Sequence, residues 1–105
     1  MPSVKWLAKA LEDVDRLYDF LSEKNPTAAR DAVRAIIASA RQLETFPEIG
    51  KPLNENPPWR ELFSPFGHGA YVLRYRIDRS GNVIITRVWH SRENRWKNRD
   101  PGSSV

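Results

Sequence analysis

The sequence has 105 residues and a formal net charge of +4, with 40% hydrophobic and 29% charged residues and no cysteine. A chain of this length predicts one domain with a single small core. The absence of cysteine excludes disulfides and thiolate metal sites, and two histidines are too few for a convincing zinc site. No apolar run approaches the ~20 residues that span a bilayer, and the first residues lack the layout of a signal peptide. We therefore expect a cytoplasmic protein without a metal or cofactor.

Charge is distributed unevenly along the chain. Residues 1–59 contain 8 Lys and Arg against 9 Asp and Glu, whereas residues 60–105 contain 9 against 4, and eight of those nine are arginines. The planar guanidinium pairs well with phosphate and carboxylate groups. The second half is therefore a candidate surface for nucleic acid or for an acidic protein, although a plain solvated basic surface would have the same composition.

A short strand at 4–6 and two helices are predicted in the first half. Apolar residues recur every three or four positions over 7–24 and again over 26–45, which predicts two amphipathic helices. These positions are Leu7, Leu11, Val14, Tyr18 and Leu21 in the first helix and Ala29, Val33, Ile36, Ile37, Ala40 and Leu43 in the second. Asn25 is a good N-cap, and Pro26 suits the first helical position because its missing N–H has no partner there. So short a connection predicts an antiparallel helical hairpin.

The second half predicts strands. Residues 47–58 contain four prolines and predict an irregular loop. We expect strands at 59–63, 70–77 and 83–90, with a hairpin loop around Gly81 between the last two. The strand at 83–90 starts with three apolar residues, so we expect it to be central. The middle strand alternates between two faces, with Tyr71, Leu73, Tyr75 and Ile77 on one and Val72, Arg74 and Arg76 on the other.

The predicted fold is α+β. It consists of a short N-terminal strand and an antiparallel helical hairpin packed on one face of a three- to four-stranded antiparallel sheet. We expect a short ordered continuation to about Trp96, which closes a domain at 1–96, and then a flexible basic tail at 97–105.

The order of these elements and several short phrases resemble the RelE/ParE superfamily of bacterial toxins. The opening V-K-W-L-x-x-A-L-E-D-V-D-R-L resembles the start of ParE chains, and N-P-x-A-A resembles their interhelix turn. The matching phrases further along are Leu43-x-x-Phe46-Pro47-x-x-Gly50, Arg60-Glu61-Leu62, Gly69-x-Tyr71-Val72-Leu73-x-Tyr75-Arg76-Ile77 and Val83-x-Ile85-x-Arg87-Val88-Trp89-His90. The resemblance covers residues 4–95, and the joint order and spacing of the phrases make it specific.

The resemblance implies the toxin of a type II toxin–antitoxin system, with roles in growth inhibition and plasmid stabilisation. ParE members inhibit DNA gyrase by trapping it on cleaved DNA, whereas RelE members cleave ribosome-bound mRNA. A cognate antitoxin is implied, with a C-terminal segment that is disordered alone and folds around the toxin as a helix in a groove or as a strand on the sheet edge. Operator DNA is bound only through the antitoxin, and no membrane partner is expected.

The residues at the matching positions favour a gyrase inhibitor that acts by binding. Metal-free RNA cleavage needs a base, an acid and cations around the phosphate, and RelE members supply these with lysines, arginines and a C-terminal tyrosine. Arg60 matches the first lysine, but the next two matching positions hold Leu62 and Val72, and Trp96 stands near the place of the tyrosine. The alternative, an mRNA endoribonuclease, would use His90 as the base. Its phosphate-binding cations would be Arg60, Arg74, Arg87 and Arg92.

A second set of candidates would bind a partner. Arg74 and Arg76 share the strand face opposite the tyrosines, and Trp89 and Trp96 are hard to bury. An exposed tryptophan among arginines is typical of a binding hot spot. We therefore predict a partner surface that contains Arg74, Arg76, Arg87, Trp89, Arg92 and Trp96. A generic nucleic-acid-binding module is a third class, disfavoured because the strand tyrosines face inward and cannot stack on bases.

Overall fold

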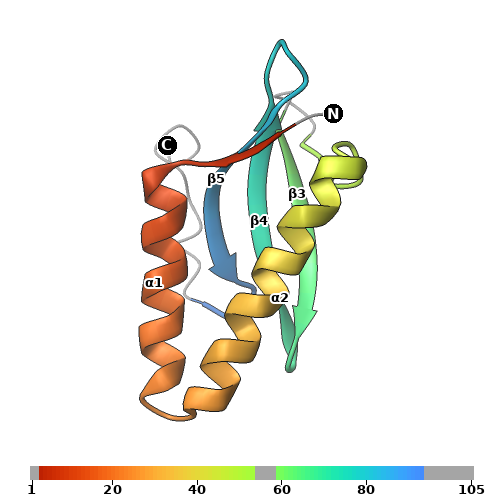
Figure 1. Cartoon of the computed structure of the whole chain (residues 1–105). Helices are drawn as coiled ribbons and strands as arrows, with labels where there is room; N and C mark the ends of the chain where they lie inside the picture. Colours follow the sequence, from red (N-terminus) through yellow and green to blue (C-terminus); the bar gives the residue numbers. More distant parts are fainter. Residues whose placement is uncertain (1–2, 54–58, 94–105) are drawn as a thin grey trace, which may run out of the picture.

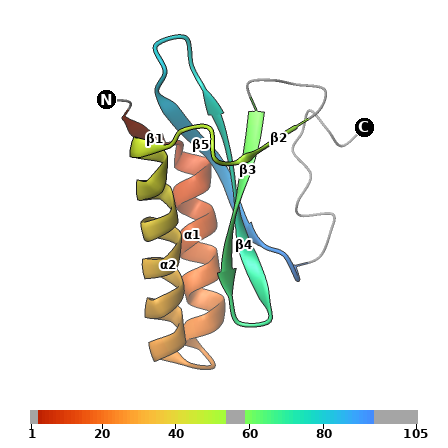
Figure 2. The ribbon, with the colours of Figure 1, turned by 90° about the vertical axis from the view of Figure 1, so that its right-hand side faces the viewer.

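A computed structural model of the chain describes residues 3–53 and 59–93. Its elements are β1 (Val4–Trp6), α1 (Ala8–Ser22), α2 (Pro26–Thr45), β2 (Lys51–Pro52), β3 (Trp59–Phe66), β4 (Gly69–Ile77) and β5 (Val83–His90). The two helices form one layer and the long strands a second (Figure 1), and the view from the side shows both helices on the same face of the sheet (Figure 2). This confirms the α+β fold with a helical hairpin on a sheet. The predicted continuation to Trp96 and the tail at 97–105 lie outside the described residues.

The sheet differs from the prediction in strand number and direction. It has five strands in the order β1-β5-β4-β3-β2, and β1 runs parallel to β5 while the other pairs are antiparallel. The prediction of a three- to four-stranded antiparallel sheet is therefore wrong in detail. The helical hairpin acts as a crossover that returns β1 and β5 side by side in the same direction. The predicted central position of residues 83–85 is confirmed, because β1 and β4 pair with them from opposite sides.

The loop region predicted at 47–58 contains the extra strand β2. Lys51 and Pro52 pair with Glu61 and Arg60 of β3. The strand β3 also extends to residue 66, three residues beyond the prediction. It does so through Pro65, which a strand tolerates at an edge where its missing N–H is not needed for the ladder.

The helix boundaries follow local signals. The Asn25 side chain accepts a hydrogen bond of 3.1 Å from the N–H of Ala28, and Pro26 is the first residue of α2, as predicted. No helix in the described ranges is long and apolar enough to cross a membrane. The core-facing side of α1 differs from the prediction, because Ala10, Asp13 and Leu17 are buried. Leu7, Leu11 and Tyr18, assigned to the apolar stripe of this helix, are exposed.

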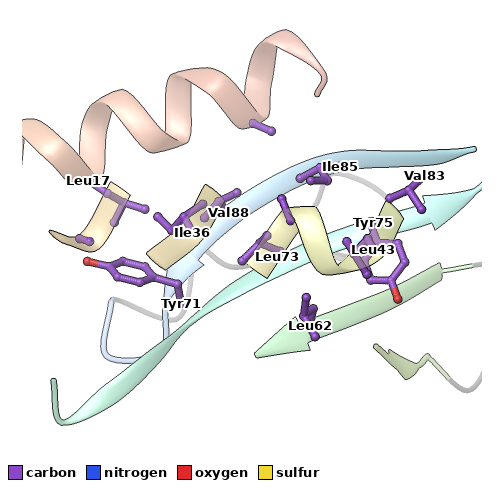
Figure 3. Packing of buried hydrophobic residues seen from close by; sticks show 13 residues of the cluster. Leu17, Ile36, Leu43, Leu62, Tyr71, Leu73, Tyr75, Val83, Ile85 and Val88 are labelled. Atoms are coloured by element: carbon purple, nitrogen blue, oxygen red, sulfur yellow. The ribbon is translucent and has the colours of Figure 1, made fainter. Parts of the chain in front are cut away.

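The core lies between the helices and the sheet, and the tyrosine face of β4 forms its floor (Figure 3). Tyr75 is fully buried, donates a hydrogen bond of 2.7 Å to the carbonyl of Pro47 and accepts one of 2.9 Å from the N–H of Gly50. A Cβ at position 50 would lie 2.5 Å from the Tyr75 hydroxyl, so only glycine fits there. Burial raises the pKa of Tyr75. The Pro-x-x-Gly phrase after the second helix is thus the partner of the second strand tyrosine.

Candidate interaction surfaces

The far half of β5 has an outer edge that β1 does not reach, because β1 pairs only with residues 83–85. The buried carboxylate of Asp13 on α1 fills this place. Its Oδ2 accepts hydrogen bonds of 2.8 Å from the Val88 N–H and 2.8 Å from Nε of Arg87. Its Oδ1 accepts from Arg87 at 3.2 Å and from Arg16 at 3.3 Å. A helix side chain thus does for β5 what the carbonyl of a neighbouring strand would do.

A second carboxylate closes the end of the same edge. Glu93 accepts a 3.0 Å hydrogen bond from the N–H of His90 and a 2.8 Å hydrogen bond from Arg16. Arg16 therefore joins Glu93 to Asp13. The pKa of Tyr71 is raised, first by burial and then by the negative charge of Glu93. This network uses two carboxylates and two arginines to seal the outer edge of β5, and it fixes α1 on that strand.

On the face of the sheet away from the helices, Arg74 occupies the centre. The register places it opposite Glu61 of β3 and Arg87 of β5. Its guanidinium forms hydrogen bonds of 2.6 and 3.0 Å with the Glu61 carboxylate and lies over the Trp89 ring at 5.2 Å. Trp89 is only 6% exposed. The expected exposure of this tryptophan is therefore not observed, and one cause is that the arginine predicted beside it covers its ring.

The other predicted partner residues are arranged less closely. Arg76 lies half-buried opposite Trp59 and Ile84, without an ion-pair partner among the described residues. Arg92 is exposed at the exit of β5. Trp96 lies outside the described ranges. The structure thus brings Arg74 and Trp89 together at one place on the outer face.

The residues of the ribonuclease alternative fall into separate groups. Arg60 donates hydrogen bonds of 2.9 and 2.7 Å to the carbonyls of Glu48 and Gly50. His90 lies opposite Tyr71, whereas Arg60 lies opposite Tyr75, four residues along β4, or roughly 13 Å. The ring of His90 contacts the Tyr71 ring edge-on at 4.9 Å between centroids. These groups do not converge on one phosphate.

His90 and Arg92 do lie together, near the β3–β4 turn. The Nδ1 of His90 accepts a 3.1 Å hydrogen bond from the N–H of Arg92, and its Nε2 is 3.5 Å from the carbonyl of Phe66. Nε of Arg92 is 3.5 Å from the carbonyl of His68. Both histidines and one arginine therefore gather at this end of the sheet.

The helical layer has an apolar groove that sequence analysis missed. A cavity of about 320 Å³ opens between the two helices and β1, lined by Val4, Trp6, Leu11, Val14, Ile37, Ala40, Arg41 and Glu44. Leu11 is 51% exposed and Ile37 43% exposed. The sequence carries one signal of it, since the apolar residues of 7–24 cover more than one helix face. One stripe faces the core, and the other lines the groove.

Comparison with known proteins places this fold among bacterial toxins. A solved structure titled "Chromosomal ParDE TA system from P. aeruginosa" matches with a TM-score of 0.70 and 27% identity, over 86% of this chain and 96% of that chain. Two relatives from Caulobacter vibrioides are named Toxin RelE1 and Toxin RelE3. The first is 38% identical over 83% of this chain and 90% of its own length, and the second 36% identical over 90% of this chain and all of its own length.

A two-helix hairpin on a mixed sheet of this order therefore defines a toxin of a toxin–antitoxin system. Residues 4–95 match the family described as "ParE toxin of type II toxin-antitoxin system, parDE". The chain belongs to the ParE toxin family, and the predicted membership of the RelE/ParE superfamily is confirmed.

Proposed function

We propose that this ParE-family toxin stops growth by binding and inhibiting DNA gyrase, and not by cleaving RNA. One observation carries the second half of the proposal: the cations that a ribonuclease would need are already engaged in the fold. Arg60 is bound to main-chain carbonyls, and Arg74 is bound to Glu61. At the other two matching positions, Leu62 and Val72 are buried apolar residues and cannot transfer a proton.

The family supports the first half of the proposal. Gyrase inhibition is the activity that the ParE resemblance implies, and it needs no catalytic residue in the toxin. A toxin that acts in this way traps the enzyme on cleaved DNA by holding one of its states. This action would take place in the cytoplasm, where the chromosome is.

The ribonuclease alternative keeps one specific observation in its favour. His90, Arg92 and the carbonyl of His68 lie together at one end of the sheet. A histidine beside an arginine can supply a base and a cation. Two relatives also carry RelE in their names.

One preparation of purified toxin distinguishes the two activities. We expect it to inhibit supercoiling by purified gyrase and to accumulate cleaved plasmid, while mRNA on translating ribosomes stays intact. Toxin premixed with its antitoxin is the control and should do neither. Codon-specific mRNA fragments, or full supercoiling at several-fold excess of toxin over gyrase, would contradict the proposal.

Membership of this family implies a cognate antitoxin. We propose that the antitoxin's C-terminal segment is disordered alone and folds as an amphipathic helix in the groove between α1, α2 and β1. The exposed apolar side chains of Leu11 and Ile37 support this site, since a helix can bury them with residues spaced three and four apart. Arg41 and Glu44 also line the groove and give its occupant one positive and one negative group to pair with.

The outer sheet face stays a second proposed contact for the same partner. An acidic segment there would meet Arg76 and Arg92, the two predicted arginines without an ion pair among the described residues. Arg74 and Arg87 already contact Glu61 and Asp13, and would add their positive charge. Operator DNA would be bound through the antitoxin.

A further inference from the structure

The outer edges of the sheet are not equally protected. A strand edge presents unpaired N–H and C=O groups that can bind another chain, and proteins usually block such edges with charges, prolines or covering elements. Asp13 and Glu93 take up the N–H groups of Val88 and His90 on the outer edge of β5. On the opposite side of the sheet, Pro52 of β2 and Pro65 of β3 lack the N–H that a further strand would use.

The outer edge of β1 has no such protection. The carbonyl of Ser3 accepts from Val83, and the N–H of Leu7 donates to the carbonyl of Ile85. Backbone groups alternate in direction along a strand, so Ser3, Lys5 and Leu7 bond to β5, and Val4 and Trp6 point their N–H and C=O groups away from the sheet. No hydrogen bond from another described residue reaches these four groups.

This edge is continuous with the apolar groove. The side chains of Val4 and Trp6 line the cavity between the helices, so the residues with unpaired backbone groups also form one wall of it. Figure 1 shows β1 running across the ends of both helices, close to the start of α1 and the end of α2. A chain that leaves the groove at this end therefore meets β1 directly.

We propose that an extended segment of the antitoxin pairs with the outer edge of β1 and extends the sheet to a sixth strand, next to the helix in the groove. The inference rests on the proposed antitoxin binding. Exposed Lys5, on the opposite face of β1 from Val4 and Trp6, favours an acidic residue opposite it. A second copy of this chain fits poorly, because an antiparallel pair of β1 strands centred on Lys5 would place the two lysines opposite each other.

Residue-resolved amide exchange tests the pairing in the wild-type toxin. The probe is the antitoxin encoded beside the toxin gene, purified in complex with it. In the free toxin, the amides of Val4 and Trp6 should exchange fast and that of Leu7 slowly. In the complex, the Val4 and Trp6 amides should slow by at least about tenfold, as expected for new hydrogen bonds. A stable complex in which these two amides exchange as fast as in the free toxin would overturn the β1 pairing alone. Failure to form any complex would overturn the proposed antitoxin binding as well.

A matched pair of variants tests the same contact by affinity. V4P removes the outward N–H and keeps a side chain of similar size, whereas V4A shortens the side chain and keeps the N–H. We expect V4P to bind the antitoxin about tenfold more weakly than V4A, the effect of losing one hydrogen bond. Equal affinities for the two variants would contradict the proposal. K5P, which removes an N–H that faces β5, marks the loss expected when the ladder itself is broken. Dimerisation of the free toxin that V4P abolishes would instead assign the edge to a second copy.

Discussion

The two layers of this toxin treat their exposed chemistry in opposite ways. The sheet side carries the arginines that make the second half of the chain basic, and most of the described ones bind within the molecule: Arg74 to Glu61, Arg87 to Asp13, and Arg60 to the loop carbonyls. The helical side belongs to the nearly neutral half, and it leaves Leu11 and Ile37 exposed around a cavity. Net charge therefore pointed to one half of the chain, while the open binding chemistry lies in the other.

This difference shows why arginine content alone is a poor guide to a binding surface. An arginine with a carboxylate neighbour contributes to the fold, and such neighbours come from distant parts of the chain. Asp13 and Arg87 are 74 residues apart. Exposed leucine and isoleucine beside a cavity, in contrast, have no equivalent partner inside the described fold.

The largest expected effect tests whether the charged network is structural. D13A should lower the free energy of unfolding by about 3 kcal/mol, because it leaves Arg87 and the Val88 N–H without their acceptor. Urea denaturation measures this change. D15A, on an exposed position of the same helix, is the matched control and should change stability by less than about 0.5 kcal/mol. Similar values for the two variants would show that the network adds little to the fold.

The next effect tests the helical groove. I37D places a charge in the apolar cavity and should weaken antitoxin binding about 100-fold, or about 2.7 kcal/mol, with little loss of stability because the residue is exposed in the free toxin. Isothermal titration calorimetry measures the affinity. The control is F20D, since Phe20 is 61% exposed on α1 but does not line the groove. Equal losses for the two variants would remove the groove as the binding site.

A smaller effect is expected where the sheet holds the loop after α2. Y75F removes the hydroxyl that bonds Pro47 and Gly50, and should cost about 2 kcal/mol because two main-chain groups lose their buried partner. Y18F, at an exposed tyrosine, should cost less than about 0.5 kcal/mol. Thermal unfolding of both variants compares them. A neutral Y75F would mean that the loop is held by Arg60 alone.

The smallest effect concerns pH and the β4–β5 hairpin. The main-chain N–H groups of Asn82 and Ser80 donate to Asp78, and they lower its pKa below the ordinary value of 3.8. The folded chain therefore favours the carboxylate, whose stabilisation is complete above the unfolded pKa and is lost as pH falls through the lower folded pKa. The stability advantage of wild type over D78N should thus shrink between about pH 5 and about pH 2.5. An advantage that is constant over this range would contradict the assignment.

Local patterns were enough to predict much of the fold. The helical hairpin follows from apolar spacing and the Asn25-Pro26 boundary, and the inward tyrosines follow from strict alternation in β4. The parallel pairing of β1 and the short β2 were not predictable, because each depends on a partner strand elsewhere in the chain.

The surfaces were predicted less well for the same reason. Composition shows that Arg74 and Trp89 share a region, but not that the guanidinium covers the ring and binds Glu61. The groove was hidden because α1 has two apolar stripes, and periodicity alone does not say which one faces the core. Burial of Asp13 decides this, and it depends on a hydrogen bond to Val88 of the last strand.

The parallel pairing of β1 with β5 has a consequence for synthesis on the ribosome. Val4 pairs with Val83, so the first strand has no neighbour until nearly the whole domain has left the exit tunnel. Contacts this distant in sequence form late. The wall of the groove and the strand edge beside it therefore become complete only as translation of the domain ends. A nascent toxin passes most of its synthesis without its finished antitoxin site, and a ribosome that stalls before residue 83 releases a chain that cannot assemble it.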